Sequence, residues 1–245
     1  LGPVYEKIVE LDAENISAII KLLQYAIDDE DEDAVFKYAN EALMFLPQHL
    51  ELHFYKGLSL YMLGNKKEST EVYLEGLEKR DAETEPAVVA GVFTILGDTY
   101  HELEMIEEAY TAYDSALVYD PYKLDVLNNY SYYLSLDGKE LQKALEMSHK
   151  TITAEPESQT YLDTYAWILF KLKRYEEAKA YAEKIISMDE EISPVVFHHI
   201  GDIFAKCGNM ENAVIYWEKA LEAGDKTDIL KKKIKKRKYY NGSKH

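Results

Sequence analysis

A small residue that recurs at nearly constant spacing is the feature that most constrains how this 245-residue chain can fold. Gly97, Ser131, Ala166 and Gly201 each follow an apolar residue and precede an aromatic residue or leucine by three positions, and Gly57 is a weaker fifth case. The successive spacings are 40, 34, 35 and 35 residues. A period in this range is typical of arrays in which each repeat is one supersecondary unit.

Each of these positions is followed, at a nearly fixed distance, by a second small residue. The second positions are Ser69, Ala109, Ala144, Ala178 and Ala213. Proline closes three of the units, at Pro47, Pro121 and Pro156. Two antiparallel helices approach closely only where the residues at their crossing are small. We therefore expect one helical hairpin per repeat, with Gly97 facing the region of Ala109.

This combination of period, small crossing residues and exit proline resembles the tetratricopeptide repeat. The clearest unit runs from Phe93 to Pro121, and the unit from Leu162 to Glu190 is nearly as good. The resemblance implies an all-α, right-handed superhelical solenoid of antiparallel hairpins, whose first helices line a concave face. In proteins that this chain resembles, that face binds extended or helical peptides. The resemblance therefore implies a non-enzymatic scaffold or adaptor that binds a protein or peptide.

The chain also resembles repeat-bearing proteins of Gram-negative bacterial envelopes. That resemblance implies a periplasmic or outer-membrane-anchored location for the full-length protein, with a cytoplasmic location as the alternative. No stretch of 18 apolar residues occurs, so no transmembrane segment is expected. The oligomeric state is left open by the sequence.

The repeats predict a single solenoid domain. We expect a partial upstream repeat at 1–14, a degenerate repeat at 15–49, repeats at 50–85, 86–123, 124–158, 159–193 and 194–226, and a basic capping helix and tail at 227–245. Because residues 5–13 read like the end of a second helix, we expect the chain to be cut from a longer protein. Extra residues around 79–86 are expected as an extended loop, or as a lip on the groove, with Thr84 capping a helix that has Pro86 in its first turn.

Helical phase assigns a set of first-helix residues to the groove. They are Phe54, Tyr61, Asp98, His101, Asn128, Tyr132, Asp163, Trp167, Phe170, His198 and Asp202. Aromatic side chains with one polar end are the usual anchors of protein-binding surfaces. We expect Tyr132, Trp167 and Phe170 to form an exposed strip, with packing between repeats as the alternative. An acidic, aromatic groove favours a ligand with basic and apolar groups.

Several other functions are disfavoured by the same residues. Some family members grip a C-terminal carboxylate with Lys and Asn on successive first helices, but the corresponding places here hold Ile20, Gln24, Tyr55, Gly91 and Ile95. The net charge of −17 argues against nucleic acid as a ligand. Single-stranded RNA binding by helical repeats therefore remains an alternative that lacks its basic groove. A second alternative is that the chain is the targeting module of a larger enzyme.

Two pairs of acid and histidine, Asp98 with His101 and His198 with Asp202, each lie on one helical face. Either pair could ligate a metal, but two ligands on one helix are weak evidence, and we expect solvated polar residues. The sequence has no nucleophile paired with a base, no P-loop and no GxGxxG loop. No catalytic site, cofactor or metal is expected.

The C-terminal residues 228–240 predict a strongly basic helix with a narrow apolar stripe of Ile229, Leu230 and Ile234. Helical arrays need a terminal element with a polar outer face, so we expect this helix to cap the last repeat. Docking to anionic lipid or to another acidic partner is the alternative.

Overall fold

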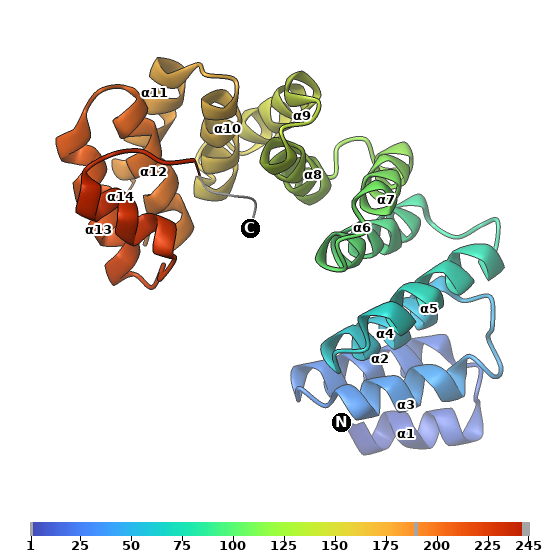
Figure 1. Cartoon of the computed structure of the whole chain (residues 1–245). Helices are drawn as coiled ribbons and strands as arrows, with labels where there is room; N and C mark the ends of the chain where they lie inside the picture. Colours follow the sequence, from blue (N-terminus) through green and yellow to red (C-terminus); the bar gives the residue numbers. More distant parts are fainter. Residues whose placement is uncertain (1, 189–190, 242–245) are drawn as a thin grey trace. The chain divides into compact units, whose positions relative to one another are not determined.

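The computed structural model describes residues 2–188 and 191–241, and all regular elements in these ranges are α-helices (Figure 1). The helices are α1 (Gly2–Leu11), α2 (Ile16–Asp28), α3 (Glu32–Ala42), α4 (Leu50–Met62), α5 (Lys66–Lys79), α6 (Pro86–Glu102), α7 (Ile106–Tyr119), α8 (Leu124–Asp137), α9 (Leu141–Ala154), α10 (Gln159–Lys171), α11 (Tyr175–Ile186), α12 (Pro194–Lys206), α13 (Met210–Glu222) and α14 (Asp228–Lys236). The predicted all-α fold of antiparallel hairpins is confirmed.

The chain forms two compact units, Leu1–Pro121 and Tyr122–His245. In the first unit, α1 packs on α2, and the pairs α2–α3, α4–α5 and α6–α7 are hairpins. Its core includes Leu23, Ala39 and Leu52 around the first hairpins, and Tyr73 and Val92 around the later ones. In the second unit, α8–α9, α10–α11 and α12–α13 are hairpins, and α14 packs on α13.

The helix crossings correct one expectation from the sequence. The ring of Tyr113, rather than Ala109, lies directly against Gly97, because a Cβ atom at Gly97 would meet a Tyr113 ring carbon at 2.6 Å. The same relation recurs, at the same separation along the chain, between Gly57 and Tyr73 and between Gly201 and Trp217. The small residue thus makes room for an aromatic ring of the second helix, which fills the space between the two helices.

The turns between paired helices use a left-handed residue to end the first helix. Three of these residues are glycines with positive φ: Gly64, Gly138 and Gly208. Glu30, Glu104 and Lys173 occupy the corresponding turns with φ of 55°, 60° and 63°. A residue with a Cβ atom is disfavoured in this conformation, so these three turns carry local strain at that position.

The extra residues around 79–86 form an extended connection, and α6 begins at Pro86. Glu85 precedes the helix as its N-cap, so the predicted cap at Thr84 is wrong by one residue. Thr84 instead donates its backbone N–H to the carbonyl oxygen of Asp81 at 3.1 Å. Proline favours the first helical position because its fixed φ suits the helix and its missing N–H costs nothing there. That preference makes the residue immediately before Pro86 the cap.

Candidate binding face on α8, α10 and α12

Aromatic side chains from three first helices meet on one face of the second unit. The ring of His199 on α12 stacks on Trp167 of α10, with centroids 3.9 Å apart and planes 15° apart. Trp167 also stacks on Phe170 at 4.8 Å, and Tyr132 of α8 approaches His199 at 6.3 Å. We call these four residues the aromatic column. It links three consecutive hairpins of the unit.

A carboxylate holds the central ring of the column in place. Nδ1 of His199 lies 2.9 Å from a carboxylate oxygen of Asp163, which is one turn before Trp167 on α10. Both residues are buried, and a buried hydrogen bond of this kind orients the ring it holds. At the other end of the column, burial raises the pKa of Tyr132 to about 12. Asp163 therefore lies beside the column and Tyr132 at one end of it, both as packed residues, and their part in a binding groove stays a prediction.

The expected exposed strip is not exposed. Trp167 retains 9% and Phe170 retains 5% of its accessible surface, and Tyr132 is half-buried. The reason lies in neighbouring segments, since His199 covers Trp167 from α12 and Tyr239 of the C-terminal tail contacts Phe170. The part these residues play in binding stays a prediction.

Two polar atoms on this face have no partner among the described residues. Nε1 of Trp167 and Oδ1 of Asn128, on α10 and α8, are both buried and make no hydrogen bond. Leaving such a group unsatisfied costs about 1–3 kcal/mol, and buried polar groups are normally paired. An unpaired donor and an unpaired acceptor are therefore groups that a ligand could satisfy once the side chains that cover them move aside.

A second cluster joins α12 to α13 and α14. Nζ of Lys233 lies 2.7 Å from both carboxylate oxygens of Asp202 and 2.8 Å from Nε2 of His198. Nδ1 of His198 lies 2.7 Å from Asp225, and Nε1 of Trp217 donates to Asp202 at 2.9 Å. We call these five residues the buried lysine cluster. Because Lys233 donates to Nε2, the Nδ1–H of a neutral His198 is the group that donates to Asp225.

Burial dominates the charges of this cluster. It lowers the pKa of His198, although the carboxylates of Asp202 and Asp225 act in the opposite direction. It also lowers the pKa of Lys233 against the attraction of Asp202. His198 and Asp202 were expected as solvated groove residues, and this expectation is wrong. They fasten the C-terminal helix to the last repeat.

The four groove residues predicted in the first unit lie on α4 and α6. Tyr61 on α4 donates to Glu102 at 2.7 Å. Asp98 accepts a 2.5 Å hydrogen bond from Tyr113 within its own hairpin. Phe54 packs against the ring of Tyr73. These contacts show Tyr61, Asp98 and Phe54 packing within the first unit. The fourth residue, His101, is half-buried and lies one turn beyond Asp98.

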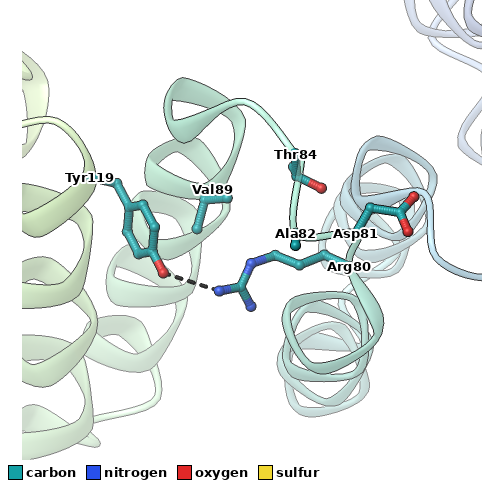
Figure 2. Close-up of a pocket in the computed structure, with 6 residues that line it drawn as sticks. All are labelled: Arg80, Asp81, Ala82, Thr84, Val89 and Tyr119. Atoms are coloured by element: carbon teal, nitrogen blue, oxygen red, sulfur yellow. Dashed lines mark hydrogen bonds between the residues drawn. The ribbon is translucent and has the colours of Figure 1, made fainter.

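A hollow of about 340 Å³ lies beside the extended connection of the first unit (Figure 2). Its lining residues are Arg80, Asp81, Ala82, Thr84, Val89 and Tyr119. Figure 2 shows the guanidinium of Arg80 reaching toward Tyr119, to whose hydroxyl oxygen it donates at 3.0 Å. Arg80 also donates to the carbonyl oxygen of Leu77. The guanidinium of Arg80 thus links the connection between α5 and α6 to Tyr119 of α7. Its N–H groups donate to other residues of the protein.

Residues 2–188 and 191–241 offer neither a metal site nor a membrane-spanning helix. In these ranges no group of three or more His, Cys, Asp and Glu side chains is arranged to hold a metal ion. None of the helices described there combines the length and the apolar character that crossing a membrane requires.

Residues 160–192 and 195–223, which include the column residues of α10 and α12, match the family model of the tetratricopeptide repeat. The chain contains tetratricopeptide repeats. Repeats of this family are typically non-enzymatic, which supports a role as a protein-interaction scaffold in general terms. No curated protein gives a significant match.

Solved structures share the fold of this tetratricopeptide repeat protein at low identity. A tetratricopeptide repeat protein from Parabacteroides merdae is 14% identical, with 96% of this chain and 90% of that chain covered and a TM-score of 0.62. The match to a chain of the APC/C hetero-tetramer Cut9–Hcn1 is 13% identical, covers 96% of this chain and 45% of that chain, and has a TM-score of 0.73. The match to YrrB, described as having an unusual peptide-binding site, is 14% identical, covers 96% of this chain and 100% of that chain, and has a TM-score of 0.56. At these identities the likeness is one of fold alone.

Sequence reasoning missed the C-terminal half of the face in this tetratricopeptide repeat protein. A basic capping helix with a polar outer face was predicted over 228–240, yet α14 ends at Lys236, Lys233 is buried, and Tyr239 lies beyond the helix and contacts Phe170. Leu230, which was placed in the apolar stripe, is fully buried as expected. Lys233 follows Leu230 by three positions and so shares its helical face, which is the signal that could have identified it.

Proposed function

We propose that this tetratricopeptide repeat protein binds a partner peptide on the face formed by α8, α10 and α12, with the aromatic column as its anchor. The observation that carries this proposal is the unpaired Nε1 of Trp167, which lies in the middle of the column. Large aromatic side chains with one polar end dominate binding energy at protein interfaces. The column supplies such side chains from three successive hairpins.

The unpaired atoms suit a peptide backbone. Nε1 of Trp167 is a donor and Oδ1 of Asn128 is an acceptor. A bound main chain offers one carbonyl oxygen and one N–H per residue, and main-chain hydrogen bonds are a common source of affinity in peptide recognition. A partner that pairs both atoms removes two desolvation costs that the free protein carries.

The test compares the two tryptophans of the chain. Trp167→Phe keeps a stacking ring and removes the unpaired Nε1–H, whereas Trp217→Phe removes an Nε1–H that already donates to Asp202. We expect Trp167→Phe to weaken capture of a partner at least tenfold without lowering the thermal midpoint. We expect Trp217→Phe to lower the midpoint and leave capture unchanged. The measurement is quantitative affinity capture from the source lysate, beside thermal unfolding of each variant.

Equal recovery of the same proteins by wild type and Trp167→Phe contradicts the proposal. Single-stranded RNA binding remains the alternative of another class, and a salt titration addresses it, because phosphate contacts make affinity fall steeply with salt. The envelope location stays a prediction, and fractionation of the source cells checks it. The full-length sequence decides whether the chain is a targeting module of an enzyme.

A further inference from the structure

The chain reverses direction immediately after α14. Arg237 adopts the left-handed conformation with φ of 46°, and the backbone N–H of Lys238 donates to the carbonyl oxygen of Lys233 at 3.2 Å. The segment that follows returns toward α12 and α10 (Figure 1). Arg237 is exposed and lacks the freedom of glycine. The turn is thus a disfavoured conformation that the surrounding contacts, including the hydrogen bond to Lys233, hold in place.

What comes after the turn is an aromatic ring seated on the candidate binding face. The edge of Tyr239 meets Phe170 with centroids 5.8 Å apart, and Nζ of Lys206 lies 4.2 Å from the centre of the Tyr239 ring. Phe170 also contacts Tyr175 at 5.4 Å. Burial raises the pKa of the Tyr239 hydroxyl. Phe170, Tyr175 and Lys206 therefore form a subsite for an aromatic ring, which we call the aromatic subsite.

This subsite is continuous with the proposed partner face. Phe170 belongs to the aromatic column through its stack on Trp167, so the ring of Tyr239 covers one end of the column. The residues on either side of Tyr239 are Lys238 and Tyr240, and Lys238 is exposed. The tail is thus a basic, aromatic segment lying on a chain with a net charge of −17. Its chemistry is that expected of a ligand for this face.

Lys233 in α14 and Tyr239 in the tail differ in how firmly they are held. Lys233 is 2% exposed and bonds to Asp202 and His198. Tyr239 is half-buried, lies outside the helices and is held to the repeats by ring contacts. Segments with few buried contacts open at low free-energy cost, while α14 remains in place.

We propose that residues 237–241 are an intramolecular ligand of the aromatic subsite, which a basic peptide carrying an aromatic residue displaces. The proposal rests on the proposed function, because it names the chemistry of the partner for the same face. A site that is open for only a fraction of the time binds its ligand more weakly in proportion to that fraction. Removing Tyr239 therefore strengthens binding of a peptide in trans, and stabilising the turn weakens it.

The test uses the full chain and a synthetic peptide with the sequence of residues 235–241, Lys-Lys-Arg-Lys-Tyr-Tyr-Asn. The peptide carries a fluorophore at its N-terminus, and its dissociation constant is measured by anisotropy. We expect Tyr239→Ala to lower the dissociation constant at least tenfold relative to wild type. We expect Arg237→Gly to raise it, because glycine adopts the left-handed turn without strain. A peptide with alanine in place of its first tyrosine should not bind.

Tyr240→Ala is the matched control, because its ring contacts Lys232 of α14 and not the aromatic subsite. We expect its dissociation constant to equal that of wild type. Circular dichroism checks that Tyr239→Ala keeps its helices. If Tyr239→Ala loses helicity, Arg237→Gly still tests the proposal, through the expected rise in the dissociation constant. Equal affinities for all chains, or no binding to Tyr239→Ala, overturn the proposal. So does a wild-type dimer that Tyr239→Ala dissociates, since the tail then binds a second copy.

The two proposals fail separately. If Trp167→Phe loses its partner but Tyr239→Ala gains no affinity for the peptide, the face binds partners and the tail is not its intramolecular ligand. If Tyr239→Ala gains affinity for the peptide while Trp167→Phe keeps its partner, the aromatic subsite works as inferred and the proposed role of the column is wrong.

Discussion

The ammonium nitrogen of Lys233 lies 2.7 Å from both carboxylate oxygens of Asp202, and the two residues are only 2% and 3% exposed. This pair joins the C-terminal helix to the first helix of the last repeat. A buried ion pair compensates its desolvation only with good geometry and further hydrogen bonds. Asp202 has such a bond from Trp217, and Lys233 has one to His198.

Removing the cation should destabilise the second unit strongly. We expect Lys233→Ala to lower the free energy of unfolding by about 3–5 kcal/mol, because it leaves a buried carboxylate without its counter-charge. Lys231→Ala is the matched control on the same helix, since its 3.3 Å pair with Asp228 is exposed and exposed pairs contribute about 0–1 kcal/mol. Urea unfolding measures both. Similar losses for the two variants would show that the buried pair is not what secures α14.

The neutral state of His198 predicts a loss of stability in mild acid. Burial lowers its pKa, while Asp202, Asp225 and Lys233 are the charged groups around it. The unfolded chain then takes up a proton at a higher pH than the folded chain. The contribution of His198 is therefore fully present above about pH 6.5 and is lost as the pH falls below that value.

Thermal unfolding between pH 7.5 and pH 5 measures this effect. We expect a smaller fall in the midpoint for His198→Gln than for wild type, because glutamine keeps a donor and an acceptor and does not titrate. His149→Gln serves as the control, since His149 is exposed on α9. An unchanged pH dependence in His198→Gln would argue against proton uptake at this histidine.

Two glycines of α6 should respond to alanine in opposite directions. A Cβ atom at Gly97 meets the Tyr113 ring at 2.6 Å, while nothing lies within 4 Å of one at Gly91. We expect Gly97→Ala to destabilise the hairpin by about 1–3 kcal/mol through overpacking. We expect Gly91→Ala to stabilise it by about 0.5–1 kcal/mol through helix propensity. Chemical denaturation of both variants decides, and a stable Gly97→Ala would mean that the ring moves aside at little cost.

Glycine should stabilise a hairpin turn whose left-handed residue is not already glycine. Lys173 has φ of 63°, in the turn where Gly208 has φ of 80° in the next hairpin. We expect Lys173→Gly to raise the free energy of unfolding by up to about 1 kcal/mol. Gly208→Ala should lower it by a similar amount. Thermal unfolding of the two variants checks the pair, and a loss in Lys173→Gly would indicate that its side chain stabilises the turn.

The helical-hairpin architecture could be predicted from the sequence, but the burial of the side chains on the candidate binding face could not. Period, small crossing residues and exit prolines predicted the hairpins, because these features act locally and repeat. Helical phase also placed Tyr132, Asp163 and Trp167 on one face. It could not show that their side chains are buried, since burial depends on His199 and Tyr239, which come from segments far along the chain.

By itself, the sequence determined that the chain folds into paired helices with aromatic and acidic residues on the first helix of each pair. Spacing along one helix sets which residues share a face, and that spacing is written in the chain. The tertiary structure alone decided that Asp202 binds Lys233 and that the ring of Tyr239 sits on Phe170. Both contacts depend on where the last helix packs and where the chain turns at Arg237, and the spacing of residues along that helix specifies neither.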